Sequence, residues 1–466
     1  MLDKYDYLVI GGGPGGTPVA SALASAGKQV LLVEKGAGLG GTCLFEGCIP
    51  SKIFRESARR LRELQESGDF GLCMPTRDVH LDWSAIQERK QVILHLRSTG
   101  AIQRIRQNSS LDITLGSAMF LDNSHARITP NAEKPVDIEF KQAIIATGSK
   151  PFRPPIKGVE ESCVVDSAQI LEINHVPERL AIIGAGPIGV ELGQVFHTFG
   201  SDVTLYEAGA HILAHADQEL AERLQQQMTE EQIRIITDCH IKRICRTGSG
   251  VFVEYQTAAG QTAHHFADTV LLVTGRRPNT EGLGLENTAV KQTPHGIQVD
   301  EKLQTTEANI FALGDVVGQP MFAHWATAQG LALAKNLLGQ PVPFPDADHN
   351  SAVIFSEPEL AMAGLTEEQA QSRDIEYEVA RYDYKRDARA QISNRAKGLL
   401  KILYESDSHR IIGIHVLVEG AGDLMGEAAL AVTQGMTLEE LACTIHPHPT
   451  LTESFSLAAR SALQKR

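Results

Sequence analysis

The sequence has few features that would direct a protein to a membrane or to nucleic acid. Its 43 lysines and arginines are outnumbered by 57 aspartates and glutamates, and the formal net charge is -14 at pH 7. This charge disfavours nucleic acid and anionic membrane surfaces as partners, because both are negatively charged. No apolar run approaches the ~18 residues that a membrane-spanning helix needs. The first apolar stretch, YLVIGGGPGG, is interrupted by glycine almost at once.

Cysteine and signals for export are also scarce. A predicted strand follows the opening residues MLDKYDYLVIGG so closely that we expect no signal peptide there. Seven cysteines, an odd number, are spread over 466 residues, unlike the dense disulfide framework of a small secreted domain. We therefore expect a cytoplasmic protein in which any disulfide takes part in chemistry.

Glycine is plentiful, with 41 residues, and some of these form a pattern. Residues 5–36 predict a strand, a glycine turn, a helix of small apolar residues and a second strand ending at Glu34. This order is the βαβ dinucleotide fingerprint. Gly11 allows the tight turn, Gly13 lets a pyrophosphate approach the backbone, and Gly16 lets helix and strand pack closely. Glu34 is placed to accept hydrogen bonds from ribose hydroxyls.

The same unit is repeated in residues 179–210. At one constant offset, its counterparts of the glycines and the acid are Gly184, Gly186, Gly189, Gly200 and Glu207. Two dinucleotide sites in one chain suggest two cofactors with electrons passing between them. A carboxylate at Glu207 repels a 2′-phosphate, and no arginine follows it in LYEAGAHILAHAD, so the second site is predicted to bind NAD rather than NADP.

Proline-rich segments divide the chain further. GSKPFRPPIKG (148–158) leads out of the first unit, and GQPVPFPDADHN (339–350) precedes β runs such as SAVIF and GLLKILY. We predict four parts with the boundaries 1–150, 151–275, 276–346 and 347–466.

Cys43 and Cys48 lie close together in GGTCLFEGCIPSK. They could belong to a metal site, be inert thiols or form a reactive disulfide. A metal site would need a second short-spaced pair of ligands, and His446 and His448 near the carboxyl end could supply it. We predict no metal.

The neighbours of the pair favour reactivity. If a helix begins near Cys48, its free N–H groups and dipole favour a thiolate, and Lys52 adds positive charge one turn later. A lowered thiol pKa is what disulfide exchange requires. The other cysteines are interpreted as small buried hydrophobes: Cys73, Cys163, Cys239, Cys245 and Cys443.

With two fingerprints, the C-x4-C pair and a histidine near the carboxyl end, the chain resembles the class I flavin-dependent pyridine nucleotide-disulfide oxidoreductases. Within this family it is most similar to the dihydrolipoyl dehydrogenases. The resemblance runs from about residue 5 to residue 460. It implies an α/β fold with two Rossmann-like domains and a carboxyl-terminal α+β dimerisation domain. Residues 1–150 would begin the FAD domain, 151–275 bind NAD, 276–346 complete the FAD site, and 347–466 form the interface of a homodimer.

The resemblance also implies the cofactor-binding residues. Asp315 would bind the ribityl chain of FAD and Ala323 would lie near the isoalloxazine ring. The full FAD set would be Gly11, Gly13, Gly16, Glu34, Lys52, Gly116, Thr147, Gly148, Asp315 and Ala323. The NAD set would be Gly184, Gly186, Gly189, Glu207 and Gly275.

The implied catalytic residues begin with the cysteine pair. Cys43 would exchange with the substrate, Cys48 would lie nearer the flavin, and Lys52 would pair with Glu191. In HPHPTLTE, His448 would act as the base in the partner subunit's site, and Glu453 would orient it.

The implied reaction is the oxidation of dihydrolipoamide to lipoamide by NAD+ through FAD. The partners would be the lipoyl groups of a 2-oxo acid dehydrogenase or glycine cleavage complex. The sequence departs from the family pattern at Phe45 and Glu46, between the cysteines, and at Trp325 and Gln329. Two alternatives stay open: an NADH-dependent reductase of another disulfide or of quinones, and a non-catalytic flavoprotein binding subunit.

Overall fold

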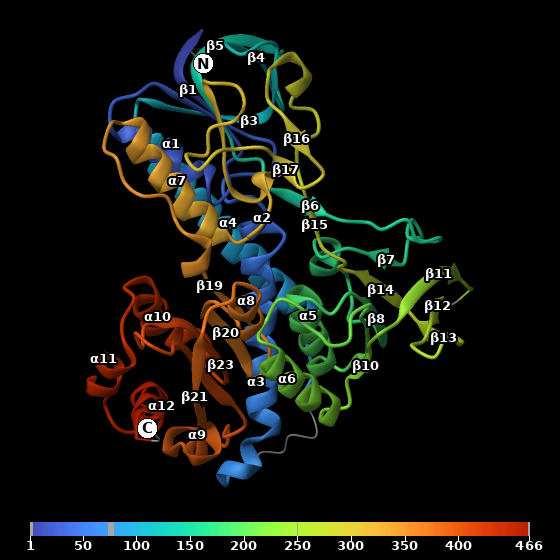
Figure 1. Cartoon of the computed structure of the whole chain (residues 1–466). Helices are drawn as coiled ribbons and strands as arrows, with labels where there is room; N and C mark the ends of the chain where they lie inside the picture. The colour runs from blue at the N-terminus through green and yellow to red at the C-terminus, as the bar shows by residue number, and fades with distance from the viewer. Residues whose placement is uncertain (1–2, 73–78, 249, 465–466) are drawn as a thin grey trace. The chain divides into compact units, whose positions relative to one another are not determined.

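The computed structural model describes residues 3–72, 79–248 and 250–464. These residues form two compact units that are each discontinuous in sequence (Figure 1). The first unit contains 1–152, 166–175 and 275–345, and the second contains 153–165, 176–274 and 346–466. The four predicted parts and their boundaries stay predictions.

The first unit is built on a mainly parallel sheet. Strand β1 pairs in parallel with β2 and β5, β2 pairs with β3, and β5 pairs with β18, while β4 joins β3 and β5 in antiparallel fashion. The strands are β1 (Lys4–Ile10), β2 (Val30–Glu34), β3 (Leu111–Phe120), β4 (His125–Pro130), β5 (Val136–Ile145) and β18 (Ile310–Ala312). All five residues of β2 are buried, because both faces of the sheet are covered.

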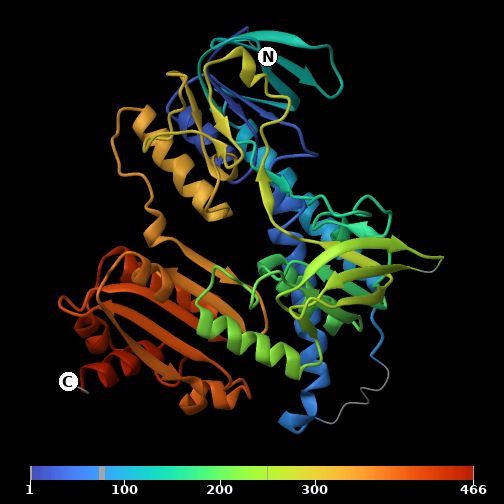
Figure 2. The same cartoon turned by 45° about the vertical axis from the view of Figure 1, so that its right-hand side comes forward.

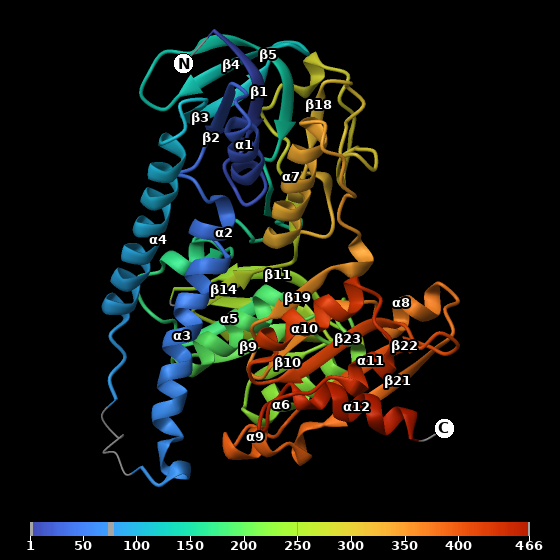
Figure 3. The same cartoon turned by 90° about the vertical axis from the view of Figure 1, so that its left-hand side faces the viewer.

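Helices α1 (Gly16–Ser25) and α7 (Ala323–Leu337) lie side by side on one face of this sheet (Figure 1). The first unit also contains α2 (Gly41–Phe45), α3 (Cys48–Gln65) and α4 (Trp83–Arg106), and Figure 3 shows α4 running beside α3. The rings of Phe54 in α3 and Trp83 in α4 lie 4.9 Å apart. Two small antiparallel pairs complete the unit: β6 (Ser149–Pro151) with β15 (Arg276–Pro278), and β16 (Gln292–Thr293) with β17 (Gly296–Ile297).

The second unit contains another parallel sheet, in the order β10-β9-β8-β14-β7. Its strands are β7 (Val164–Val165), β8 (Arg179–Ile183), β9 (Asp202–Tyr206), β10 (Arg234–Ile236) and β14 (Thr269–Leu272). Its helices are α5 (Pro187–Thr198) and α6 (Gln218–Glu230). A separate antiparallel sheet projects beside it (Figure 2) and consists of β11 (His240–Arg246), β12 (Val251–Gln256) and β13 (Thr262–Ala267).

The remainder of the second unit is an antiparallel sheet in the order β19-β20-β23-β22-β21. Its strands are β19 (Ser351–Ile354), β20 (Glu359–Gly364), β21 (Tyr377–Asp383), β22 (Leu399–Glu405) and β23 (Ile411–Val418). A large apolar cluster joins one face to α10 (Ala421–Thr433), α11 (Leu438–Cys443) and α12 (Glu453–Leu463). Helix α6 contacts β20 and β23, and the short helices are α8 (Glu367–Ser372) and α9 (Ala388–Ile392).

Both βαβ repeats predicted from the glycine pattern are confirmed. In the first repeat (residues 5–36), β1, α1 and β2 follow one another, and in the second repeat (residues 179–210), β8, α5 and β9 do so. In each repeat the turn between strand and helix lies at the carboxyl end of parallel strands, the usual ligand-binding edge of such sheets.

Candidate redox and nucleotide-binding sites

The glycine turn of the first repeat can be formed only by glycine at two positions. Gly11 has φ +109°, and a Cβ there would lie 2.2 Å from the carbonyl oxygen of Ala146. A Cβ on Gly16 would lie 1.8 Å from the carbonyl oxygen of Gly11. Gly13 differs, because its nearest neighbour would be the Cα of Gly41 at 3.9 Å. The turn therefore leaves room beside Gly13, at the amino end of α1, where a pyrophosphate fits.

Glu34 closes this turn with both carboxylate oxygens. Gly12 N–H donates to Oε2 at 2.6 Å and Gly36 N–H donates to Oε1 at 2.5 Å. A carboxylate has about four acceptor positions, so both oxygens can still accept from ribose hydroxyls. The predicted contact of Glu34 with a ribose stays a prediction, and the local geometry fits it.

The second repeat has the same geometry. Gly184 has φ +106°, and a Cβ there would lie 2.4 Å from the carbonyl oxygen of Val273. A Cβ on Gly189 would lie 2.0 Å from the carbonyl oxygen of Gly184, whereas one on Gly186 would meet nothing within 4 Å. The room for a pyrophosphate is therefore present in the second repeat as well.

Glu207 is held as Glu34 is. Ala185 N–H donates to Glu207 Oε2 and Gly209 N–H donates to Oε1, both at 2.9 Å. The backbone N–H groups of Ala185 and Gly209 therefore orient this carboxylate.

Several residues of the predicted FAD set meet in the first unit. Thr147 Oγ1 donates to the carbonyl oxygen of Asn279 at 2.7 Å, and Asn279 N–H donates to the carbonyl oxygen of Gly148 at 2.9 Å. Asp315 Oδ2 accepts from Ser149 Oγ at 2.6 Å. The first two contacts join the loop after β5 to Asn279, which follows β15, and the third joins β6 to the 3₁₀ turn that carries Asp315.

The remaining predicted FAD residues are placed by other contacts. A Cβ on Gly116 would lie 2.2 Å from the carbonyl oxygen of Thr129, so the pairing of β3 with β4 already explains this glycine. Ala323 is the first residue of α7. Gln329, a departure from the family pattern, is buried and its Oε1 accepts from Gly314 N–H at 2.8 Å. The side-chain amide of Gln329 thus holds the backbone next to Asp315.

Sequence reasoning missed Arg276. This arginine follows Gly275, which has φ +119°, and it donates to Ser149 through Nε (to Oγ, 2.7 Å) and Nη2 (to the carbonyl oxygen, 2.8 Å). Burial lowers the pKa of Arg276, and the charge of Asp315 opposes this lowering. The arginine is visible in the motif TGRRPN. Its partner, Ser149, lies more than a hundred residues away in the sequence, so the contact could not be predicted from the motif.

The cysteine pair lies at the junction of α2 and α3. Cys43 belongs to α2, and α3 begins at Cys48, so the helix start that the sequence analysis expected is present. Both are free thiols. Lys52 lies one turn into α3, as the sequence analysis expected. A positive charge and a helix start at this place favour a thiolate.

The expected thiolate at the helix start beside Cys48 stays a prediction, whereas the pKa of Cys43 is raised in this dithiol state. A hydrogen bond with Cys48 raises the pKa of Cys43 most, burial raises it further, and the charges of Lys52 and Arg97 only partly oppose this. The two thiols thus interact directly, as a pair that can form a disulfide must.

His448 and Glu453 form a local pair at the start of α12. His448 Nδ1 lies 3.0 Å and 3.1 Å from the two carboxylate oxygens of Glu453, and Thr450 N–H donates to Oε2 at 3.0 Å. These contacts lower the pKa of Glu453, with the Thr450 N–H as the largest cause. The His448 side chain is 73% exposed, so its other nitrogen is accessible.

His446 has a different environment. Its side chain is only 6% exposed, its Nε2 lies 2.7 Å from Glu427 Oε1, and its ring stacks on Phe455. His446 is therefore built into the fold, and His448 is the histidine available to a reacting group.

The predicted partners Lys52 and Glu191 belong to different units of the structure. Lys52 lies in the first unit, and Glu191 lies in α5 of the second, where Glu191 Oε1 accepts from Phe355 N–H at 2.9 Å. The Lys52–Glu191 ion pair and the approach of His448 to the cysteines of the partner subunit stay predictions.

The other cysteines mostly behave as expected. Cys239 is buried, and Cys163 and Cys245 are partly buried. Cys443 is exposed, so its interpretation as a buried hydrophobe is wrong; it ends the short helix α11, at the edge of the apolar cluster. Cys73 lies outside the described residues.

The described residues contain neither a group of side chains suited to a metal ion nor a helix suited to a membrane. Within 3–72, 79–248 and 250–464, no group of three or more His, Cys, Asp or Glu side chains could hold a metal ion. In the same ranges no helix combines the length and apolar character needed to cross a bilayer.

Known proteins resemble this chain over its full length. Residues 5–330 match the family described as pyridine nucleotide-disulphide oxidoreductase, and residues 350–459 match the dimerisation domain of that family. The chain is 36% identical over 461 residues to dihydrolipoyl dehydrogenase of Geobacillus stearothermophilus, covering 99% of this chain and 96% of that protein. The Staphylococcus aureus dihydrolipoyl dehydrogenase is also 36% identical, with 99% and 97% covered.

A solved structure adds a second kind of relative. The Cu(II) complex of RclA, an HOCl-induced flavoprotein disulfide reductase from Escherichia coli, superposes with a TM-score of 0.88 at 27% identity, covering 99% of this chain and 100% of RclA. The predicted fold class is confirmed by these matches, and the dimerisation domain indicates a homodimer. The chain belongs to the pyridine nucleotide-disulphide oxidoreductase family and is a flavoprotein disulfide oxidoreductase with FAD and NAD as its cofactors.

Proposed function

We propose that this enzyme oxidises dihydrolipoamide to lipoamide, with NAD+ as the electron acceptor. One observation carries this proposal: an interacting Cys43–Cys48 pair at the start of α3, in a chain 36% identical over 99% of its length to dihydrolipoyl dehydrogenases. The acid at Glu207 favours NAD over NADP as the nucleotide.

The cysteines exchange bonds with the substrate. In the oxidised enzyme Cys43 and Cys48 form a disulfide. A substrate thiolate attacks Cys43 Sγ, forms a mixed disulfide and releases Cys48 as a thiolate. The second substrate thiolate then attacks the substrate sulfur bound to Cys43, closes the lipoamide disulfide and releases Cys43. FAD, held by the residues predicted for it, would supply the redox chemistry by which the electron pair of the two cysteines reaches NAD+.

His448 takes the proton from the first attacking thiol and releases it to solvent, and it then takes the proton of the second thiol and returns it to Cys43 as that cysteine leaves. Glu453 accepts from His448 Nδ1, which leaves the Nε2 atom of the exposed ring to act as the base. Because Thr450 N–H also binds this carboxylate and lowers its pKa, Glu453 stays ionised at neutral pH and keeps the imidazole oriented. In the homodimer this histidine would serve the cysteine pair of the partner subunit.

The nucleotide and structural roles follow the two repeats. We assign the glycines and Glu34 of the first repeat to FAD, with Asp315, Thr147 and the other residues predicted for that site, and those of the second repeat to NAD. Lys52 would pair with Glu191 beside the flavin. The four parts 1–150, 151–275, 276–346 and 347–466 are the domains we propose for these tasks.

The proposed partners are lipoyl groups of a 2-oxo acid dehydrogenase or glycine cleavage complex, and the proposed location is the cytoplasm. Similarity to proteins named dihydrolipoyl dehydrogenase supports the lipoyl partners. The odd number of cysteines, with no disulfide among the six described ones, supports the cytoplasmic location.

The test is NADH formation by the purified holoenzyme with dihydrolipoamide and NAD+, with NADP+ in parallel. We expect rapid turnover with NAD+ and much slower turnover with NADP+. The absence of turnover in an enzyme whose flavin NADH still reduces would favour a reductase of another disulfide or of quinones. An enzyme whose flavin neither dithiol nor NADH reduces would support a binding subunit.

A further inference from the structure

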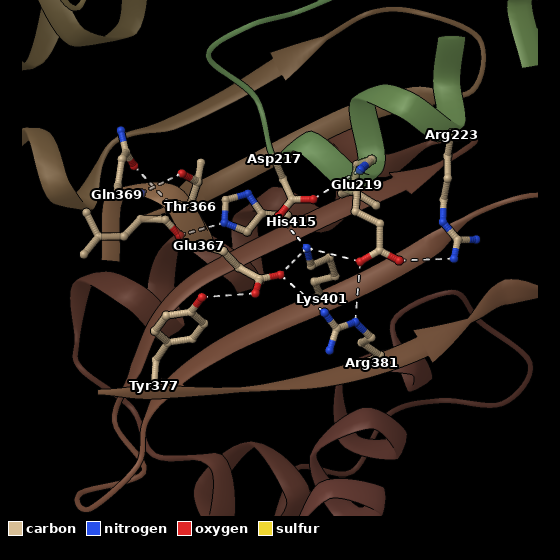
Figure 4. A network of polar contacts seen from close by, with 12 residues as sticks. Asp217, Glu219, Arg223, Thr366, Glu367, Gln369, Tyr377, Arg381, Lys401 and His415 are labelled. Carbon is tan, nitrogen blue, oxygen red and sulfur yellow. Dashed lines mark hydrogen bonds and ion pairs between the residues drawn. The ribbon is translucent and has the colours of Figure 1, made fainter. Parts of the chain in front are cut away.

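The second unit contains a buried charged cluster for which neither the cysteines nor the nucleotide turns give a reason (Figure 4). At its centre is Lys401, a single cation in the apolar strand β22, LLKILYE. The side chain of Lys401 is 2% exposed and that of its partner Asp217 is fully buried. A buried lysine is retained only when its charge is compensated, so the partners of this residue indicate what it holds.

Lys401 has three donors and three carboxylate acceptors. Its Nζ lies 2.7 Å from Asp217 Oδ2, 2.5 Å from Glu367 Oε1 and 3.3 Å from Glu219 Oε2. Burial lowers the pKa of Lys401, but the hydrogen bonds to Asp217 and Glu367 outweigh this and raise it overall. The ammonium group is therefore charged and fully engaged.

Cross-strand neighbours organise the cluster on the sheet. Arg381 in β21 and His415 in β23 are the residues directly opposite Lys401 in the antiparallel register. Arg381 binds Glu367 and Glu219 at 3.3 Å and 3.5 Å. Burial lowers the pKa of His415, whose Nε2–H donates to the carbonyl oxygen of Leu365 at 2.8 Å, so His415 is neutral and does not compete with Lys401 for the carboxylates.

Asp217 connects this sheet to the second nucleotide turn. It is the N-cap of α6, where its Oδ1 accepts from Leu220 N–H at 3.1 Å. It is also the last residue of the β9–α6 loop, which we define as residues 207–217. This loop begins with Glu207, the acid proposed to bind the ribose of NAD.

The β9–α6 loop holds the glycine turn by two hydrogen bonds to one residue. Ala185 N–H donates to Glu207 Oε2, and the carbonyl oxygen of Ala185 accepts from Leu213 N–H, each at 2.9 Å. Leu213 has φ +55°, a left-handed conformation that a leucine keeps only when its surroundings hold it there. Leu213 lies four residues before Asp217, and the buried ion pair fixes that end of the loop.

We propose that Lys401 is a positioning residue for NAD: through Asp217 it holds the β9–α6 loop, and through Leu213 and Glu207 it sets the turn that receives the pyrophosphate and ribose. This inference rests on the proposed NAD site of the second repeat. The inference implies that the antiparallel sheet containing β22 affects the affinity for NAD, although Lys401 itself lies outside the glycine turn.

The test is the dissociation constant of NAD+ for the oxidised holoenzyme, measured by isothermal titration calorimetry. Lys401→Met keeps the apolar stem and removes the charge, Asp217→Asn keeps a cap for α6 but removes its charge, and Lys401→Arg restores a cation. A matched control is Lys397→Met. Lys397 pairs with Glu230 of α6 at 2.9 Å, but the two side chains are 68% and 49% exposed.

We expect Lys401→Met and Asp217→Asn to weaken NAD+ binding about 3- to 30-fold, the range of coupling transmitted through packed networks. Lys401→Arg should recover most of this loss and Lys397→Met should show none. Flavin absorbance and its reduction by dithionite should be unchanged in all four variants. Asp217→Asn retains polar partners, so it reports the loss of binding even if Lys401→Met does not fold.

Two results would overturn the inference and can be told apart. If wild type binds NAD+ and folded Lys401→Met and Asp217→Asn bind it equally well, the cluster only stabilises the fold. If wild type itself binds no NAD+, the proposed NAD site is wrong, and the positioning role falls with it. Neither result depends on dihydrolipoamide as the substrate.

Discussion

The two repeats of this enzyme share one turn and differ in the segment beyond it. In the first repeat Gly12 N–H donates to Glu34 and the Gly12 carbonyl oxygen accepts from Gly40 N–H at 2.8 Å. In the second, Ala185 makes the same two bonds with Glu207 and Leu213. The correspondence continues through the loop at the same sequence offset.

Beyond that point the repeats diverge. Three residues after Gly40 the first repeat reaches Cys43, and α3 begins soon after at Cys48. Four residues after Leu213 the second repeat reaches Asp217, which is buried against Lys401. We propose that the shared turn provides a nucleotide cradle in both repeats, while the next segment provides a redox pair in one case and an anchor in the other.

We expect the largest effect on turnover from replacing Cys43, the cysteine that follows the first repeat. Cys43→Ser removes the sulfur that the substrate thiolate attacks, and it should lower dihydrolipoamide turnover by about 10³-fold or more. Reduction of the flavin by NADH should persist, because the second repeat is untouched. Cys163→Ser, which changes a partly buried cysteine of the second unit, is the control and should retain turnover. Normal turnover in Cys43→Ser would exclude the scheme.

The next largest effect, on stability, is expected from replacing Lys401, which anchors the segment after the second repeat through Asp217. Lys401→Met leaves the buried carboxylate of Asp217 without its cation and should destabilise the second unit by about 3–5 kcal/mol in chemical denaturation. Lys397→Met, at an exposed ion pair, should change stability by no more than about 0.5 kcal/mol. Equal effects of the two substitutions would contradict the account of the cluster.

The pH dependence of that loss has a definite sign. The pKa of Lys401 is raised above 10.5, so its contribution is complete below this pH and is lost as the pH rises through the folded-state value. The pKa of Glu219 is lowered below 4.5: burial would raise it, but the charge and hydrogen bond of Lys401, together with Arg381 and Arg223, more than offset this. Its contribution is therefore present above pH 4.5 and lost as the pH falls through the folded-state value. The difference between wild type and Lys401→Met should be constant over about pH 6–9 and shrink in acid.

A smaller effect sharpens the comparison between the two acids. Glutamine at either position replaces one carboxylate oxygen by an NH2 group facing a backbone N–H, which should cost about 1.5–3 kcal/mol of binding, roughly ten- to hundredfold in Kd. Glu34→Gln should lose FAD during purification. Glu207→Gln should retain FAD and bind NAD+ weakly. Flavin absorbance and calorimetry measure the two outcomes, and loss of FAD from Glu207→Gln would reverse the assignment.

The smallest expected effect concerns the open side of the second turn. Since a Cβ on Gly186 would meet nothing within 4 Å, Gly186→Ala should change stability by less than about 1 kcal/mol. It should nevertheless weaken NAD+ binding, because the methyl group occupies the space meant for the pyrophosphate. Gly189→Ala is the contrasting variant, since its Cβ would lie 2.0 Å from the carbonyl oxygen of Gly184, and it should be strongly destabilised. Unchanged NAD+ affinity in Gly186→Ala would place the pyrophosphate elsewhere.

Local patterns predicted much of this molecule. The strand–turn–helix order of both repeats, the glycines that need close backbone approach and the helix start at Cys48 depend on residues near one another in sequence. The contact of His448 with Glu453 also spans only five residues, but it was implied by the family resemblance and not by the local pattern.

Contacts between distant segments were not predictable in the same way. Lys401 stands out as the one charge within the apolar run LLKIL, but its partner Asp217 is 184 positions away and becomes a neighbour only when α6 packs on the sheet. Arg276 likewise meets Ser149 through the pairing of β15 with β6. The pKa of Cys43 depends on its hydrogen bond with Cys48, which spacing alone could not show.

The central claim is that electrons enter beside the first repeat and leave at the second. Its most direct test is an anaerobic stopped-flow experiment in which the oxidised holoenzyme meets dihydrolipoamide alone, and NAD+ only afterwards. The account predicts a change in flavin absorbance with the dithiol, absent in Cys43→Ser, and then return of the oxidised spectrum with formation of NADH. A wild-type spectrum that the dithiol leaves unchanged, in an enzyme that NADH does reduce, would contradict it.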